Sequence, residues 1–224
     1  MGTSLQSEIT VQVTCTRKKL FDALAAAGFS FKEKFQIEDY YYTHLDPLKS
    51  KIEFKLLSKN SCLIRNVKLE RKYFSADGVT TLLYKKKDID DDNRVKSEVK
   101  ISTTVDDKNS ARRVLSSMGL RNWCIKQMTG HIFKKGTQEI LVQEVEGLGL
   151  FMEIEEFDGQ KGTAAVKLGV LKKFVNALDI PIGDNYHCNI AYMLYLQELT
   201  AKAKAKKAAA KKPSFAPRVV SCKK

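Results

Sequence analysis

Residues 145–155 read VEGLGLFMEIE, and this stretch ends in two glutamates at positions 153 and 155. The pattern after the glycines predicts a strand from Leu150 to Phe157. Side chains alternate between the two faces of a strand, so Glu153 and Glu155 lie on the same face. Adjacent carboxylates repel one another unless a cation lies between them, and Mg²⁺ or Mn²⁺ takes oxygen ligands of this kind. The alternative is a half-exposed strand whose two glutamates are solvated.

The rest of the pattern predicts an α+β fold with about eight strands, mainly antiparallel and closed or nearly closed into a β-barrel, with flanking helices. Further strands are predicted at residues 7–14, 36–43, 51–57, 63–74, 79–87, 94–102, 123–133 and 139–145. Helices are predicted after the first strand, with Thr16 as the N-cap and Gly28 at the end, at 106–118, at 163–178, and from about 185 into the C-terminal alanines.

The positive charge is concentrated at the C-terminal end. The 224 residues carry a formal net charge of +13, and residues 201–224 hold eight lysines, one arginine and no acidic residue, which is +9. Residues 1–200 are therefore predicted to form the domain. Residues 201–224 are predicted to be a basic Ala/Lys-rich extension, helical at first and disordered beyond Pro213. Its expected partner is anionic, either RNA or an acidic protein surface, and solvent alone is the alternative.

The sequence shows no sign of membrane insertion or secretion. No stretch is apolar for long enough to span a membrane, and residues 1–13 lack the basic and apolar blocks of a secretory signal. The five cysteines are scattered and never spaced as Cys-x-x-Cys, which predicts free thiols and no zinc site. A cytoplasmic protein, monomeric or homodimeric, is expected.

Strand parity places several charged residues where they can share one face of the sheet. The residues with this parity are Glu8, Arg65, Arg71, Lys85, Arg94, Glu98, Lys126, Glu153 and Glu155. A metal-bound polyphosphate needs this mixture, because cations take the phosphate oxygens while carboxylates hold the bridging metal. Charged strand faces are also typical of ordinary solvated sheets, so parity alone leaves both interpretations open.

From Glu8 to about Leu199, the sequence resembles the CYTH superfamily, the triphosphate tunnel metalloenzymes. These include class IV adenylyl cyclases, thiamine triphosphatases and inorganic tripolyphosphatases. VEGLGLFMEIE at 145–155 is similar to the family segment VEGLG.F.EIE, and LLYKK at 82–86 is similar to the strand LTYKG. Weaker similarities are EDYYY at 38–42, LIR at 63–65, RVKSE at 94–98 and PIGDNYHCNIAYMLYL at 181–196.

The resemblance implies an eight-stranded antiparallel tunnel that binds a triphosphate along its axis and holds one or two divalent cations, Mg²⁺ or Mn²⁺. At the matching positions, the metal ligands would be Glu8, Glu98, Glu153 and Glu155, and catalysis would depend on the last two. The phosphate-binding residues would be Lys85, Arg94, Lys126 and either Arg65 or Arg71.

Four positions depart from the family pattern. Thr10 and Gln12 replace the second acid and the lysine of an opening Glu-x-Glu-x-Lys motif, Gln143 stands at an acidic position, and Met128 stands where arginine is usual. Three functions therefore stay open. They are hydrolysis of inorganic, nucleoside or thiamine triphosphate, cyclisation of ATP to cyclic AMP, and a non-catalytic binding or structural module that the basic tail anchors in a larger assembly.

Overall fold

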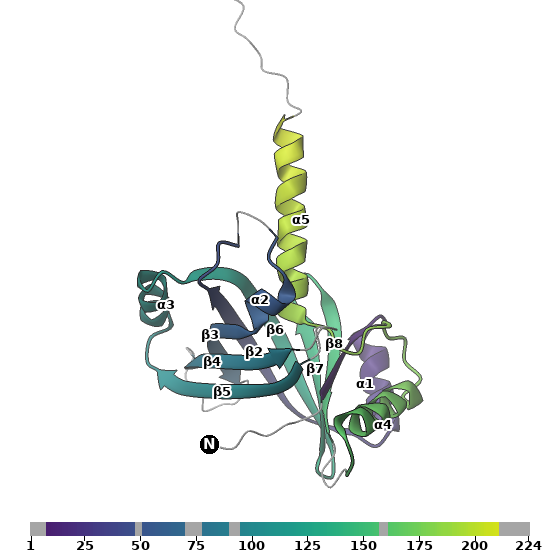
Figure 1. The fold of residues 1–224 in the computed structure, drawn as a ribbon. Helices are drawn as coiled ribbons and strands as arrows, with labels where there is room; N and C mark the ends of the chain where they lie inside the picture. Colours follow the sequence, from purple (N-terminus) through teal and green to yellow (C-terminus); the bar gives the residue numbers. More distant parts are fainter. Residues whose placement is uncertain (1–7, 48–50, 70–77, 90–94, 157–160, 211–224) are drawn as a thin grey trace, which may run out of the picture.

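The computed structural model describes residues 8–47, 51–69, 78–89, 95–156 and 161–210, which form one curved sheet and the helices around it (Figure 1). The strands are β1 (Glu8–Val13), β2 (Ser30–Thr43), β3 (Asn60–Leu69), β4 (Val79–Ile89), β5 (Val95–Val105), β6 (Arg121–Lys135), β7 (Gln138–Val145) and β8 (Gly149–Glu155). The helices are α1 (Arg17–Ala26), α2 (Phe54–Ser58), α3 (Lys108–Ser117), α4 (Ala164–Ala177) and α5 (Ile190–Ala210).

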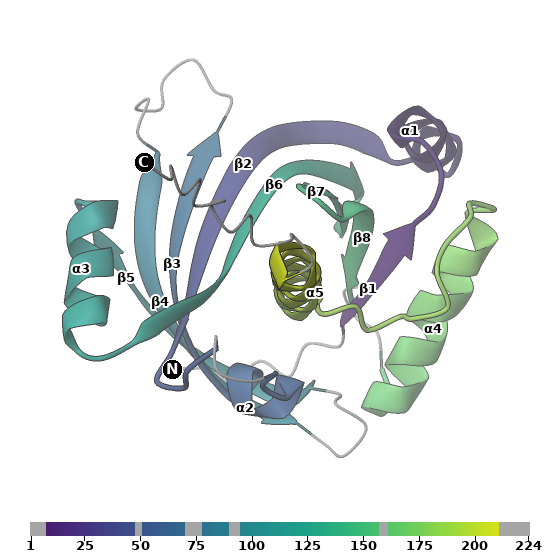
Figure 2. The ribbon, with the colours of Figure 1, turned by 90° about the horizontal axis from the view of Figure 1, so that it is seen from above.

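The sheet is antiparallel throughout, in the order β1-β8-β7-β6-β2-β3-β4-β5, and it curves around α5 (Figure 2). The predicted α+β class and the eight antiparallel strands are confirmed, but the sheet is not closed into a barrel. Among the described residues, no ladder joins the two edge strands, β1 and β5.

The open sheet has a physical reason, because the second edge of β1 is already occupied. The amide of Thr10 donates to the carbonyl of Tyr186 at 3.1 Å, and the amide of Cys188 donates to the carbonyl of Thr10 at 3.0 Å. The amide of Gly183 also donates to the carbonyl of Gln12 at 2.9 Å. These bonds satisfy backbone groups that β5 would need for closure.

The prediction of a strand at residues 51–57 is wrong. Phe54–Ser58 form the short helix α2, and the residues before it run without regular structure. The amide of Ile52 donates to the hydroxyl of Tyr195 at 3.1 Å, and the hydroxyl of Tyr192 donates to the carbonyl of Ile52 at 3.2 Å. Two tyrosines of α5 therefore satisfy backbone groups that the prediction assigned to a neighbouring strand.

The outer face of the sheet at β1, β7 and β8 packs against α1 and α4. Its fully buried residues include Ile9, Val11, Ile140 and Ile154. Thr16 caps α1 as predicted, since its hydroxyl accepts from the amide of Lys19. Because Ile9 and Ile154 point outward, the residues beside them in sequence point to the opposite, inner face.

The inner face of the sheet is the concave face that curves around α5 (Figure 2), and much of it is apolar. Phe35, Ile37, Met128, Val145 and Phe151 form a buried cluster there, and Ile190 of α5 packs on it. This cluster is named the inner apolar cluster below. Side chains of this kind bury apolar surface and offer no charge to a phosphate.

Gly130 of β6 allows the ring of Phe35 to lie against the sheet. A Cβ at this position would lie 2.4 Å from the ring, so Gly130→Ala should destabilise the fold by about 1–3 kcal/mol in urea unfolding. Gly169 of α4 is the matched control, because a Cβ there meets nothing within 4 Å and alanine should stabilise the helix by up to about 1 kcal/mol. Equal effects of the two variants would contradict the close packing of Phe35.

The last helix extends into the basic region. α5 runs to Ala210, it projects from the sheet (Figure 1), and its residues 201–205 are exposed. Within the described ranges, no helix combines the length and the apolar character that crossing a bilayer requires. The domain boundary at residue 200 stays a prediction, and residues 211–224 lie outside the described residues.

Candidate metal and phosphate site

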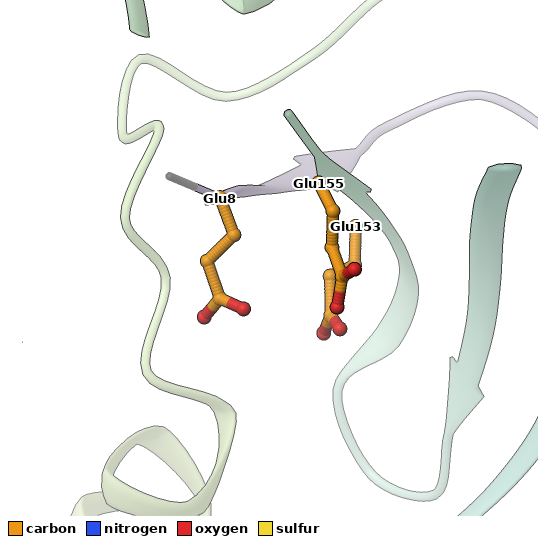
Figure 3. Close-up of side chains that lie close together, drawn as sticks. All are labelled: Glu8, Glu153 and Glu155. Atoms are coloured by element: carbon orange, nitrogen blue, oxygen red, sulfur yellow. The ribbon is translucent and has the colours of Figure 1, made fainter. Parts of the chain in front are cut away.

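Three carboxylates come together where β1 begins and β8 ends. Glu8 lies opposite Glu155 in the β1–β8 ladder, and the ligand oxygens of Glu8, Glu153 and Glu155 lie within 4.8 Å of one another. Figure 3 shows their side chains pointing the same way from the two adjacent strands. The structure thus brings together three of the four residues that the resemblance assigned to the metal.

The electrostatics of this carboxylate cluster fit a divalent cation. Partial desolvation raises the pKa of Glu155, the charges of Glu153 and Glu139 raise it further, and Lys100 offsets part of the effect. The side-chain amide of Gln143 donates to Glu153 at 2.7 Å and holds that carboxylate in place. Carboxylate oxygens that repel one another in the absence of a cation are the ligands that Mg²⁺ or Mn²⁺ prefers in proteins.

The remaining assigned residues divide into those inside and outside the described part of the chain. Arg71 and Arg94 lie outside it. Glu98 lies in β5 opposite Lys87, but only its backbone is described. Because Arg71 lies outside the described residues, the choice between Arg65 and Arg71 as the phosphate-binding arginine stays open.

Arg65 and Lys126 share a buried carboxylate that the sequence analysis missed. Asp39 is 0% exposed, and it accepts from Nε and Nη2 of Arg65 at 2.7 and 2.8 Å. Nζ of Lys126 lies 3.4 Å from the same carboxylate. Burial alone would raise the pKa of Asp39, but the hydrogen bond from Arg65 and the charges of Lys126 and Arg65 hold it below its ordinary value.

Asp39 could have been found only from strand order. It lies in β2 directly opposite Arg65 of β3 on one side and opposite Lys126 of β6 on the other. The sequence gives only the face of the strand on which Asp39 of EDYYY lies. It does not reveal that β3 and β6 are the neighbouring strands. These two cations therefore already have an anion of the protein as their partner.

Lys85 and a residue without an assigned role form a second basic group. Lys85 of β4 lies directly opposite Lys100 of β5. Their parity is that of Leu83, which is buried opposite Leu63 on the inner face. Lys100 is exposed, and its charge offsets part of the rise in the pKa of Glu155, so this lysine lies within electrostatic reach of the carboxylate cluster.

Comparison with known proteins identifies the fold. No family model matches the sequence. A protein of Methanocaldococcus jannaschii that has been proposed to be an adenylate cyclase is 27% identical over 153 residues, which is 68% of this chain and 77% of that protein. A proposed adenylate cyclase from Vibrio parahaemolyticus, 14% identical, superposes with a TM-score of 0.58 over 89% of this chain and 99% of that chain. The chain shares the fold of this solved structure, in agreement with the resemblance of its sequence to the CYTH superfamily.

Two further solved structures share the fold of this chain. A protein of Pyrococcus horikoshii, 21% identical, superposes with a TM-score of 0.61 over 86% of this chain and 98% of that chain. A proposed adenylyl cyclase from Hippeastrum, described as having a dominant triphosphatase activity, is 14% identical and superposes with a TM-score of 0.55 over 86% and 96% of the two chains.

The four departures from the CYTH pattern share the inner face. Thr10 lies opposite Glu153, and the side-chain amide of Gln12 donates to the carbonyl of Leu148 at 3.3 Å. Gln143 is 1% exposed beside Glu153, and Met128 belongs to the inner apolar cluster. Neutral or apolar side chains thus replace charged ones on the inner face, and the carboxylate cluster remains at the end of β8.

Proposed function

We propose that this protein binds a triphosphate-containing ligand together with one divalent cation, Mg²⁺ or Mn²⁺, and hydrolyses it. The observation that carries the proposal is the carboxylate cluster of Glu8, Glu153 and Glu155, whose ligand oxygens lie within 4.8 Å of one another in a CYTH fold. The triphosphatase activity described for the Hippeastrum protein favours hydrolysis over cyclisation of ATP.

The residues of the chain have separate parts in this reaction. Glu8, Glu153 and Glu155 supply oxygen ligands for the cation, and Gln143 fixes the orientation of Glu153. Lys85 and Lys100, which face one another on β4 and β5, attract the phosphate oxygens. A divalent cation, when bound, supplies Lewis-acid polarisation of a phosphoryl oxygen.

The test is an assay of the purified full chain with tripolyphosphate, ATP or thiamine triphosphate, each with Mg²⁺ or Mn²⁺. Release of inorganic phosphate from one of these ligands supports the proposal, whereas formation of cyclic AMP from ATP would support a cyclase instead. Binding without turnover would raise Tm, because a ligand of the folded state stabilises it, and would support the non-catalytic module. No product and no change in Tm at millimolar ligand would contradict the proposal.

The basic extension supports a second role, attachment to an anionic partner such as RNA or an acidic protein. Deleting residues 201–224, which carry +9, should change the free energy of unfolding by less than about 0.5 kcal/mol. The deletion should weaken binding to a uridine-only RNA 20-mer, and the difference from the full chain should shrink as salt is raised.

A matched control keeps the length of the extension and replaces its lysines and arginine by glutamine. If charge is the cause, this variant should bind the RNA as weakly as the deletion. A large loss of folding stability on deletion would instead show that the extension packs on the domain.

A further inference from the structure

The two edge strands of the sheet differ in what covers them. Residues 181–188 form hydrogen bonds with the edge of β1 that does not pair with β8, whereas β4 is the only strand beside β5 among the described residues. In an antiparallel strand, the N–H and C=O groups of alternate residues point away from the paired neighbour. Along β5, which Figure 1 shows at the edge of the sheet, these groups can therefore bond to an added strand.

The side chains of β5 are open to solvent on both faces of the sheet. Residues 99–104 are all exposed, and Val99 and Ile101 are 41% and 52% exposed. Tyr84 of β4 lies directly opposite Ile101 and is 40% exposed. These three apolar side chains share the outer face of the sheet edge and are named the edge strip below. Apolar side chains beside an unpaired edge favour pairing with another chain.

The charges of β5 fit a second copy of the same strand in one register. When a two-fold axis relates two antiparallel copies of a strand, the residue on the axis lies opposite its own copy. An axis through Lys100 would place two lysines opposite one another, which is unfavourable. An axis through Val99 instead places each Lys100 opposite position 98 of the other copy, which is a glutamate. This register therefore forms two pairs of opposite charge and joins the two edge strips at Val99.

We propose that this protein forms a homodimer in which the β5 strands of two copies pair antiparallel about Val99 and join the two sheets into one. The ladder comprises residues 95–103 of each copy. The inference goes beyond the proposed function and does not depend on it. Lys100 stays available to a phosphate, because an ammonium group has three hydrogen-bond donors. A single strand ladder buries less surface than a permanent dimer does, so the dimer should dissociate with a Kd of about 10–100 µM.

The test is sedimentation equilibrium of the full chain over a range of concentrations. Lys100→Glu places like charges opposite one another and should raise the Kd of the dimer at least about tenfold. Combining Lys100→Glu with Glu98→Lys exchanges the two charges and should return the Kd to within about threefold of the parent. The matched control is Lys19→Glu, which makes the same change of net charge at an exposed position of α1 and should leave the Kd within about threefold.

Val99→Cys tests the register, because only the residue on the axis meets its own copy. Opposite Cα atoms of antiparallel strands lie about 4.5–5.5 Å apart, which a disulfide can span. Oxidation should therefore produce more covalent dimer than in the parent, which has five cysteines. Ile101→Cys is the matched control, because position 97 of the other copy lies opposite it.

Three results would overturn the proposal. One is a chain that stays monomeric up to about 200 µM, which would show that Lys100 protects the edge from pairing. Another is a dimer whose Kd does not change in Lys100→Glu, since the copies would then meet elsewhere. The third is covalent dimer from Ile101→Cys but not from Val99→Cys, which would exclude the register about Val99. None of these results bears on the binding or hydrolysis of a triphosphate.

Discussion

Replacing Asp39 by asparagine should destabilise the fold by about 3–5 kcal/mol, measured as the free energy of unfolding in urea at pH 7. The variant keeps the size of the side chain but leaves Arg65 and Lys126 without the anion that both contact at the centre of the inner face. The control is Asp22→Asn in α1, where the ion pair with Lys18 is exposed and the loss should stay within about 0.5 kcal/mol. A loss below about 1 kcal/mol for Asp39→Asn would contradict the structural role of the buried carboxylate.

The same ion pairs should make folding stability depend on pH. Because the pKa of Asp39 is lowered in the folded state, its contribution is complete above the unfolded-state pKa of about 3.9 and is lost as pH falls through the lower folded pKa. Between about pH 5 and pH 2, the parent should therefore lose more stability than Asp39→Asn, as measured by the urea midpoint. Parallel losses in the two proteins would show that other carboxylates cause the acid sensitivity.

Glu153→Gln should lower metal-dependent phosphate release by at least about 100-fold once the parent is shown to be active. The substitution removes one of the three charges that would hold the cation and keeps the shape of the side chain, so Tm should change little. Binding of Mn²⁺, followed by electron paramagnetic resonance, should weaken in parallel, and Glu155→Gln should behave in the same way.

The matched control for these variants is Glu198→Gln in α5. The side chain of Glu198 is 54% exposed and pairs with Lys202 of the same helix, so phosphate release and Mn²⁺ binding should stay at the level of the parent. Unchanged metal binding in both Glu153→Gln and Glu155→Gln would show that the cation, if any, is held elsewhere.

Local patterns predicted the parts of the fold that depend on neighbours in sequence. Thr16 was found as a cap because its partner lies three residues away, and Glu153 and Glu155 were placed on one face because strand parity has a period of two. The prediction of a strand at residues 51–57 was wrong because this segment depends on partners that are distant in sequence. Its backbone partners, Tyr192 and Tyr195, lie about 140 residues further along the chain, and no local pattern reveals them.

By itself, the sequence determined the alternation of faces along each strand, the caps and ends of the helices, and the presence of enough carboxylates and cations for a phosphate site. Only the tertiary structure decided which charges meet. Glu8 joins Glu153 and Glu155 because β1 pairs with β8, and Asp39 neutralises Arg65 and Lys126 because β2 lies between β3 and β6. The sheet likewise stays open because residues 181–188 form hydrogen bonds with the edge of β1 that does not pair with β8. The physical reason is that side-chain direction follows from local backbone geometry, whereas the partner of a charge or a strand edge depends on segments that only folding brings together.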